Sequence, residues 1–158
     1  MKIALVSDTH HILSSVEKAC RIIEKEKPDL IIHLGDVMDD AEVMEAILER
    51  EVRRVPGNCD YSVHEPQELL IKTEHLTLLA VHGHAQGVKS TLGLLARHAK
   101  EKGAQVAFYG HTHIADESVV DGVTLLNPGS AALPKRGQKP SLAMVTVGTS
   151  ASFKLIHL

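Results

Sequence analysis

The first 57 residues alternate short apolar runs with amphipathic stretches, and this alternation restricts the fold more than any other feature of the chain. Apolar runs at 3–6, 30–34 and 52–55 predict three buried strands. Between them, apolar residues recur at helical spacing over 16–27 and 41–48. Strand, helix, strand, helix, strand is the order of a parallel sheet with helical crossovers, so the sequence predicts an α/β fold.

The ends of the two helices are marked by capping and breaking residues. Ser14 or Ser15 is expected to cap the first helix, which Pro28 ends. Asp39 or Asp40 is expected to cap the second. The second helix is predicted to bury one face, made of Ala41, Met44, Ile47 and Leu48.

The second half of the chain predicts a hairpin over 68–73 and 76–81, then a helix over 88–102 that Gly103 ends. Asp121-Gly122 is typical of a tight hairpin turn. Further short strands are expected at 106–109, 118–120, 123–126, 142–147 and 153–157. We expect a two-layered core in which a mostly parallel first half meets an antiparallel second half.

Composition excludes several classes of protein. A chain of 158 residues with 44% apolar residues predicts a single domain over 1–158. Its net charge of −3 argues against strong nucleic-acid binding. Two cysteines, Cys20 and Cys59, are too few for a disulfide framework. No apolar run reaches the roughly 18 residues of a membrane span, and none resembles a signal peptide, so we expect a cytoplasmic protein with no membrane partner.

Five predicted strands end in small polar clusters. These are Asp8-Thr9-His10, Gly35-Asp36, Gly57-Asn58-Cys59-Asp60, His82-Gly83-His84 and Gly110-His111-Thr112-His113. If the strands share one sheet, all five clusters meet just outside its carboxyl edge. Imidazole, carboxylate and carbonyl oxygen together suit Mn²⁺, Fe²⁺, Zn²⁺ or Ni²⁺, whereas structural zinc favours thiolates.

The spacing within the clusters supports a metal site. In Asp8-x-His10 and His111-x-His113, alternate side chains point the same way if the backbone is extended, so each pair can reach one site. Glycines beside the candidate ligands let the backbone turn sharply and approach closely, namely Gly35, Gly57, Gly83 and Gly110.

Each cluster taken alone also fits a structural role. Asp8 and Asp36 could cap helices, and Asn58-Cys59-Asp60 could be only a turn. A lone His82 or His111 is more often a hydrogen-bonded loop residue than a ligand. Five such clusters after five predicted strands nevertheless favour one shared metal site.

The remaining histidines and a basic loop are expected to have other roles. His33 lies inside a strand and is expected to pack or to support a ligand, while His11 and His84 could face substrate or solvent. Four histidines are expected at the surface: His64, His75, His98 and His157. A basic patch could touch phosphate but is expected to be a solvated loop; it comprises Lys135, Arg136 and Lys139.

Taken in order, the five clusters resemble the motifs of calcineurin-like metallophosphoesterases over about residues 1–130. The stretch Asn127-Pro128-Gly129-Ser130 also resembles the small YfcE-type branch of bacteria and archaea. The resemblance implies an α/β fold that is a four-layer α/β/β/α sandwich with mixed sheets. It also implies two divalent metal ions, with Mn²⁺ expected and Ni²⁺, Zn²⁺, Fe²⁺ or Mg²⁺ as alternatives.

The same resemblance implies which residues hold the ions. The first ion would bind Asp8, His10, Asp36 and His113. The second would bind Asp36, Asn58, His82 and His111, so that Asp36 is shared. Asp36, Asn58 and His82 are also expected to act in catalysis.

By this resemblance the chain is a phosphodiesterase that attacks a small phosphodiester with a hydroxide activated by two metal ions. Two alternatives stay open: a catalytically weak metal-binding scaffold, like a retromer-type trafficking subunit of the same fold, and a nucleotide phosphatase. The scaffold type typically loses some histidine ligands, whereas this chain keeps the full set. Assembly into a homo-oligomer also stays open.

The position after Gly57-Asn58 departs from the wider family. Many relatives have a histidine there that helps the leaving group depart, whereas this chain has Cys59. A thiol, whose pKa is about 8.5, is a poor replacement for an imidazolium that assists the leaving group. We therefore expect hydrolysis to depend strongly on the acidity of the leaving group. Cys59 could equally be a small packed residue in a tight turn.

Overall fold

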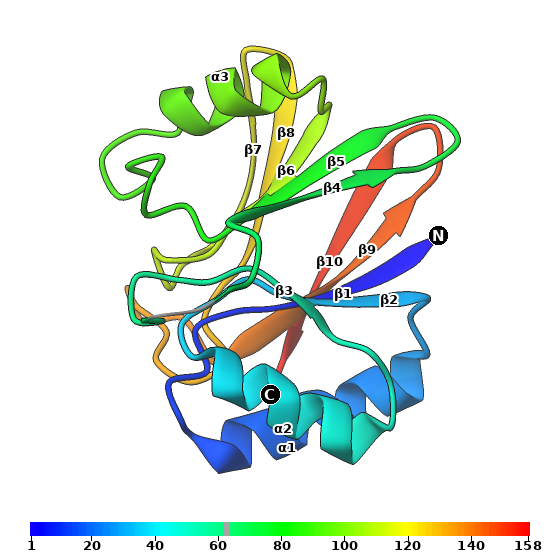
Figure 1. Ribbon diagram of the computed structural model, residues 1–158, viewed down its shortest axis with the longest axis vertical. Helices are drawn as coiled ribbons and strands as arrows, with labels where there is room; N and C mark the ends of the chain where they lie inside the picture. Colours follow the sequence, from blue (N-terminus) through cyan, green and yellow to red (C-terminus); the bar gives the residue numbers. More distant parts are fainter. Residues whose placement is uncertain (62–63) are drawn as a thin grey trace.

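The computed structural model describes residues 1–61 and 64–158, and it contains two five-stranded sheets that pack face to face with helices outside them (Figure 1). The first sheet has the strand order β10-β9-β1-β2-β3, and the second has the order β4-β5-β6-β8-β7. Both sheets are mixed, because each contains parallel and antiparallel pairs. The layers therefore follow the order helix, sheet, sheet, helix, which confirms the four-layer α/β/β/α sandwich.

The first sheet combines the start of the chain with its end. Its strands are β1 (Lys2–Val6), β2 (Leu30–His33), β3 (Arg53–Arg54), β9 (Ser141–Val147) and β10 (Ala151–His157). Helices α1 (Leu13–Glu26) and α2 (Met38–Leu48) cover its outer face (Figure 1). Side chains alternate between the faces of β1: Ala4 and Val6 pack toward these helices, while Ile3 and Leu5 pack toward the second sheet.

The second sheet is built from the middle of the chain. Its strands are β4 (Glu68–Lys72), β5 (Thr77–Val81), β6 (Val106–Phe108), β7 (Ala115–Val120) and β8 (Val123–Pro128). Helix α3 (Gly93–Glu101) covers its outer face by packing Leu95 and Ala96 against Leu79 and Ala107. A separate cluster between the sheets joins Leu5 and Ile32 to Phe108 and other buried residues, which fixes the two sheets against each other.

Strand pairing differs from the sequence-based expectation in two ways. The second half is not simply antiparallel: β5–β6 and β6–β8 are parallel, because α3 provides a crossover between β5 and β6. The strands that precede the five polar clusters do not share one sheet either. β1, β2 and β3 lie in the first sheet, whereas β5 and β6 lie in the second.

Several predicted helix ends are wrong. Neither α1 nor α2 has a side-chain cap: their N-caps are Ile12 and Val37, and the predicted capping residues Ser14, Ser15, Asp39 and Asp40 lie inside the first turns. The carboxylate of Asp40 instead accepts a hydrogen bond from the His11 amide (2.9 Å). The predicted face of α2 is buried except at Ile47, which is 40% exposed.

Other local predictions fare better. Helix α1 ends at Glu26, before Pro28, and Asp121 and Gly122 form the hairpin turn with positive φ angles of 50° and 80°. Helix α3 begins at Gly93 rather than at 88, because the amides of Ser90 and Thr91 close a turn onto the Gly87 carbonyl. Within the residues that the structure describes, no helix has the length and apolar character needed to cross a membrane.

Candidate metal centre

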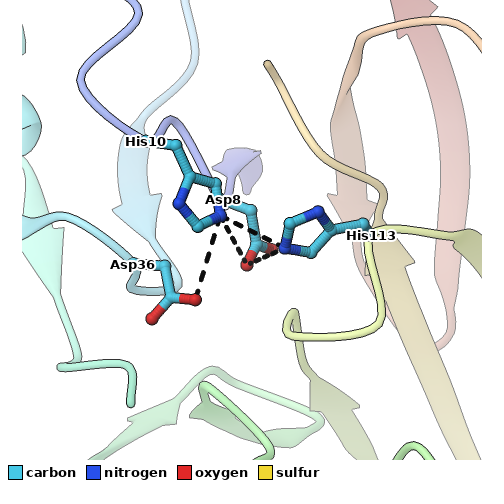
Figure 2. A group of neighbouring side chains, drawn as sticks. All are labelled: Asp8, His10, Asp36 and His113. Carbon is cyan, nitrogen blue, oxygen red and sulfur yellow. Dashed lines mark hydrogen bonds and ion pairs between the residues drawn. The ribbon is translucent and has the colours of Figure 1, made fainter. Parts of the chain in front are cut away.

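The polar clusters of both sheets meet at one end of the sandwich and form two adjoining groups of potential ligands. Atoms of the first group lie within 4.8 Å of one another; its members are Asp8, His10, Asp36 and His113 (Figure 2). The second group meets the same limit and comprises Asp36, His82 and His111. Asp36 belongs to both groups, which is the arrangement expected from the sequence.

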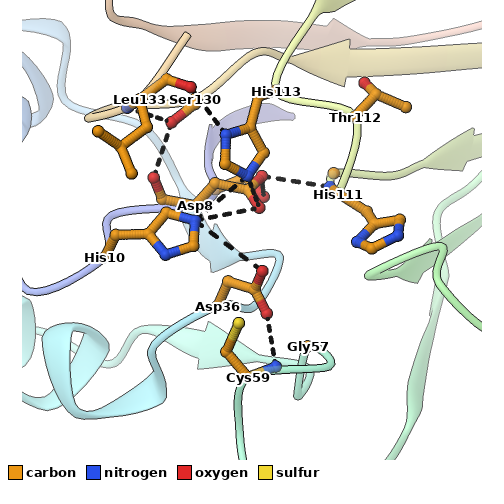
Figure 3. A network of polar contacts seen from close by, with 12 residues as sticks. Asp8, His10, Asp36, Gly57, Cys59, His111, Thr112, His113, Ser130 and Leu133 are labelled. Carbon is orange, nitrogen blue, oxygen red and sulfur yellow. Dashed lines mark hydrogen bonds and ion pairs between the residues drawn. The ribbon is translucent and has the colours of Figure 1, made fainter. Parts of the chain in front are cut away.

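Asp8 presents one free oxygen to the first group. Its Oδ2 accepts a hydrogen bond from the Ser7 hydroxyl (2.6 Å). It also accepts one from the His111 amide (3.2 Å; Figure 3). Its buried Oδ1 accepts no hydrogen bond from the described residues and lies 3.2 Å from His113 Nε2. Burial alone would raise the pKa of this carboxyl, but hydrogen bonds and the charges of His113 and His82 hold the pKa below its ordinary value. A buried carboxylate with one unpaired oxygen fits a cation.

The histidines of the first group bring ring nitrogens close to that oxygen. His113 Nδ1 donates to the Leu133 carbonyl (2.7 Å), so Nε2 of the neutral ring is an acceptor. His113 Nε2 lies 3.2 Å from His10 Nε2. A backbone carbonyl that fixes the tautomer in this way is the usual partner of a metal-binding histidine. Two converging imidazole nitrogens beside a carboxylate again fit a divalent cation.

Asp36 faces both groups at once. Its Oδ2 lies 3.9 Å from His10 Nε2 in the first group, while its Oδ1 lies 3.5 Å from His82 Nε2 in the second. Oδ1 also accepts a hydrogen bond from the Cys59 amide (3.0 Å). Burial opposes ionisation, yet His82 and this amide keep the pKa of the Asp36 carboxyl well below its usual range. One carboxylate thus offers an oxygen to each side.

The second group is arranged around His82. His82 Nδ1 donates to the Leu34 carbonyl (2.6 Å), which leaves Nε2 free to accept. This Nε2 lies 3.2 Å from Asn58 Oδ1 and 3.2 Å from His111 Nδ1. The structure therefore brings all seven sequence-predicted residues to the two groups, with Asn58 joining through its amide oxygen.

The histidines of the centre titrate in different ways. The adjacent carboxylate of Asp8 raises the pKa of His113 despite partial burial. Burial lowers the pKa of His82, but the carboxylates of Asp36 and Asp8 outweigh it and raise the pKa overall. Burial, helped by the charges of His82 and Lys89, lowers the pKa of His111 to about 4. The carboxylates of Asp8 and Asp36 thus favour positive charge at His82 and His113.

The backbone at the ligand positions is strained rather than extended, which corrects the sequence-based expectation. Positive φ angles of 48–67° occur at five of these positions: Asp8, His10, Asp36, His111 and His113. Such conformations cost about 1–3 kcal/mol each in non-glycine residues and cluster at functional sites. The turned backbone also sends His111 and His113 to different groups instead of one.

Two glycines let main chain approach the carboxylates. A Cβ on Gly57 would overlap Asp36 Oδ1, and a Cβ on Gly110 would overlap the Ser7 hydroxyl and lie 3.0 Å from Asp8 Oδ2. Any other residue at either position would push a carboxylate out of place.

Sequence reasoning missed the residues that hold the ligand loops. The Asp60 carboxylate accepts three hydrogen bonds from backbone amides, those of Asp36 (3.0 Å), Gly57 (2.8 Å) and Met38 (2.8 Å). Asn127 Nδ2 donates to the Gly110 carbonyl (3.1 Å) and the Thr112 hydroxyl (3.0 Å).

Two serines support Asp8 itself: Ser7 at its carboxylate and Ser130 at its carbonyl (2.8 Å). Ser7, Asn127 and Ser130 are each completely buried. In the sequence, Ser7 and Asn127 directly follow apolar runs and Ser130 ends the family-like stretch 127–130, but small polar residues at such places look like ordinary turns.

The other histidines lie outside the two groups. His33 is buried, donates from Nε2 to the Thr9 hydroxyl (3.1 Å) and accepts from the Gly35 amide (3.2 Å), so it supports the loops as expected. The His11 ring is mostly exposed beside Asp40, and the His84 ring lies 5.4 Å from that of His82.

Among the four histidines expected at the surface, His98 is half-buried, and its Nε2 lies 2.6 Å from Glu68 Oε2. The other three are exposed, as expected: His64, His75 and His157. The basic patch divides, because Lys135 and Arg136 line a cavity and Lys139 is not among the residues that line it.

Comparison with known proteins places these features in a family. Residues 1–150 match the model of the calcineurin-like phosphoesterase superfamily domain. The probable metallophosphoesterase YsnB of Bacillus subtilis is 35% identical over 96% of this chain and 88% of its own length. Phosphodiesterase YfcE of Escherichia coli is 28% identical over 92% of this chain and 87% of its own length.

Solved structures agree on the fold. The structure of YfcE, described as a phosphoesterase, aligns with a TM-score of 0.74 at 25% identity over 92% of this chain and 88% of that one. Vps29 of Entamoeba histolytica complexed with zinc aligns with a TM-score of 0.77 at 19% identity, over 99% of this chain and 98% of that one. The likeness to Vps29 shows the fold alone.

Proposed function

The chain belongs to the calcineurin-like phosphoesterase superfamily, and from this premise we propose that it is a phosphodiesterase that hydrolyses small phosphodiesters with two divalent metal ions. The observation that carries the proposal is the position of Asp36, which offers one carboxylate oxygen to each group of ligands. A pair of ions that share a carboxylate suits the in-line displacement of a phosphate ester. We also propose that residues 1–158 act as one domain in the cytoplasm, with Mn²⁺ as the metal.

In this proposal the first ion is held by Asp8, His10, Asp36 and His113, and the second by Asp36, Asn58, His82 and His111. When bound, such ions acidify water and neutralise charge on the phosphate oxygens. Other residues of the chain orient the proposed ligands. The carbonyls of Leu133 and Leu34 fix the tautomers of His113 and His82, and Ser7 leaves only one Asp8 oxygen free.

Three groups near the metal centre, Cys59, Asp60 and His84, are poorly suited to act as an acid for the leaving group. Cys59 lies beside Asp36, and burial together with that carboxylate raises the pKa of its thiol, so the thiol stays neutral and protonated. Both oxygens of Asp60 accept backbone amides. Burial and the charge of His82 lower the pKa of His84, which is therefore neutral near pH 7. These features support a reaction in which the leaving oxygen departs with its own charge.

A hydrolysis assay tests the proposal. Chelator-treated protein is assayed on bis(p-nitrophenyl) phosphate and on p-nitrophenyl phosphate after addition of Mn²⁺, Ni²⁺, Zn²⁺ or Mg²⁺. We expect metal-dependent hydrolysis of the diester, fastest with Mn²⁺, and slower hydrolysis of the monoester. Preference for the monoester would indicate a phosphatase, and binding of metal without hydrolysis of either ester would indicate a scaffold.

A further inference from the structure

A cavity of about 390 Å³ adjoins the metal centre. Thr112, which stands between His111 and His113 in the chain, lines it, so the cavity lies beside the loop that carries one proposed ligand of each ion. The volume falls within the roughly 300–1,000 Å³ typical of small-molecule sites. The metal centre itself therefore covers only part of the surface that a substrate can contact.

Three cationic side chains line this cavity: Lys89, Lys135 and Arg136. None has an acidic partner within 4.0 Å in the part of the chain that the structure describes. One carboxylate, Asp116, also lines the cavity, but its Oδ2 is engaged by the hydroxyls of Tyr109 (2.8 Å) and Ser118 (2.9 Å). The cavity is thus positively charged in a chain whose net charge is −3.

The basic loop is held in place rather than free. The Lys135 amide donates to the His113 carbonyl (3.0 Å), which ties the loop to a ligand position. The Gln138 side chain accepts a hydrogen bond from the Ala115 amide (2.7 Å) at the start of β7. Between these two anchors, Arg136 adopts a positive φ of 53°. A strained residue fixed at both sides is typical of a binding element.

The cavity also has an apolar part. Val88, Leu92 and Ile114 contribute to its wall, which gives a flat or apolar group a surface to pack on. A ligand that fits all of these features combines an apolar ring with an anionic group, and it extends from a phosphate at the metal centre.

We propose that this cavity binds one ester group of the phosphodiester and selects a nucleoside that carries a second phosphate. The proposal rests on the proposed function, because the scissile phosphate is placed at the metal centre. It goes further by giving the substrate class: the phosphodiester of a nucleotide, with the additional phosphate on Lys89, Lys135 and Arg136 and the nucleoside against the apolar wall.

A matched pair of chromogenic substrates tests this selection. Thymidine 5′-(p-nitrophenyl phosphate) and its 3′-phosphorylated form have the same scissile bond and leaving group and differ only in the second phosphate. We expect the 3′-phosphorylated substrate to have a kcat/KM about tenfold higher or more, mainly through a lower KM. The ratio of the two kcat/KM values is the readout, since a change common to both substrates cancels.

Substitutions in the basic loop test whether the preference for the 3′-phosphorylated substrate comes from the cavity. In Lys135→Gln with Arg136→Gln, the ratio should fall close to one, whereas Lys139→Gln in the same loop should keep the native ratio. A native ratio of one, or a high ratio that survives in the double variant, would overturn the proposal.

Calorimetric binding of thymidine 3′,5′-diphosphate gives a readout that needs no turnover. We expect the native protein to bind it and the double variant to bind it at least tenfold more weakly. Equal binding by both proteins counts against the cavity. Absence of hydrolysis of all esters, including bis(p-nitrophenyl) phosphate, would instead contradict the proposed function, so the two failures are distinguishable.

Discussion

The two sheets contribute different chemistry to the metal centre. Loops after β1, β2 and β3 of the first sheet supply both carboxylates and one amide, with a single imidazole: Asp8, Asp36, Asn58 and His10. Loops after β5 and β6 of the second sheet supply only imidazoles: His82, His111 and His113. Each group of ligands mixes residues from both sheets, so the centre is complete only when the sheets are packed together.

This division explains the electrostatics of the centre. Negative charge comes from the first sheet, and the raised pKa values of His113 and His82 show that imidazoles of the second sheet respond to it. Metal ions at the proposed centre would therefore compete with protons for the same nitrogen atoms. Each prediction below changes one side of this interface.

The largest effect is expected from removing one ligand from each sheet in turn. Asp8→Asn takes charge from the first sheet, and His82→Gln takes an imidazole from the second. Since each proposed ion needs both sheets, hydrolysis of bis(p-nitrophenyl) phosphate should fall by more than the roughly 10–100-fold typical of losing a supporting residue. His75→Gln, an exposed position, is the control. Full activity in either ligand variant would mean that one sheet suffices.

Adding an imidazole to the first sheet gives the next largest effect. Cys59→His should speed hydrolysis of diesters with poor leaving groups, toward the roughly 10²–10⁴-fold that general acid catalysis supplies. p-Nitrophenyl esters, which need no acid, should change little. Rates for a series of aryl and alkyl diesters measure this dependence.

Two further results bear on Cys59. Unchanged kinetics in Cys59→Ser would support a packing role for the native thiol. A native enzyme with equal rates for all leaving groups would show that another acid already acts, and loss of activity in Cys59→Ala would show a direct role for sulfur.

The third prediction concerns pH. Histidines with a raised folded pKa stabilise the metal-free protein below their unfolded pKa of about 6.5, and this stability is lost as pH rises through the raised value. A metal ion must displace protons from these histidines in order to bind them. The affinity of the protein for Mn²⁺ should therefore rise from pH 6 to pH 8, by up to about tenfold per pH unit for each proton released. Mn²⁺ titrations with measured proton release test this, and equal affinity at both pH values would exclude these histidines as ligands.

The smallest effect is expected from loosening a support on the first sheet. Ser7→Ala removes the hydroxyl that occupies Asp8 Oδ2 (2.6 Å), and metal affinity should fall about tenfold. Ser141→Ala is a matched control, because Ser141 is similarly buried but its hydroxyl donates to the Pro128 carbonyl (2.7 Å) and not to a proposed ligand. Equal affinities in the two variants would show that Ser7 acts through packing alone.

The sequence identifies the ligands better than it identifies their surroundings. Asp8, Asp36 and His82 stand within two residues of the end of a buried apolar run, and that local pattern is enough to predict them as candidate ligands. Strand pairing depends on distant residues: β9 pairs with β1 through Lys2 and Thr146, and no local feature of 142–147 indicates this partner. The same limit led to the wrong expectation that all five clusters belong to one sheet.

The backbone conformation at the ligand positions also cannot be predicted from the sequence. Non-glycine residues rarely adopt positive φ, so local propensity favours extended backbone at His111 and His113, whereas in the fold the His111 amide bonds Asp8 and the His113 carbonyl bonds the Lys135 amide. The supporting role of Ser130 comes from a hydrogen bond to the Asp8 carbonyl made across the fold, whereas Ser7 bonds the carboxylate of the next residue in the chain.

The central claim is that the two sheets share one centre of two ions through Asp36. The direct test is the metal content of purified native protein and of Asp36→Ala after equilibration with Mn²⁺. We predict two ions per native chain and loss of both in the variant, because Asp36 offers an oxygen to each group. Retention of even one ion at native affinity by Asp36→Ala would contradict the account.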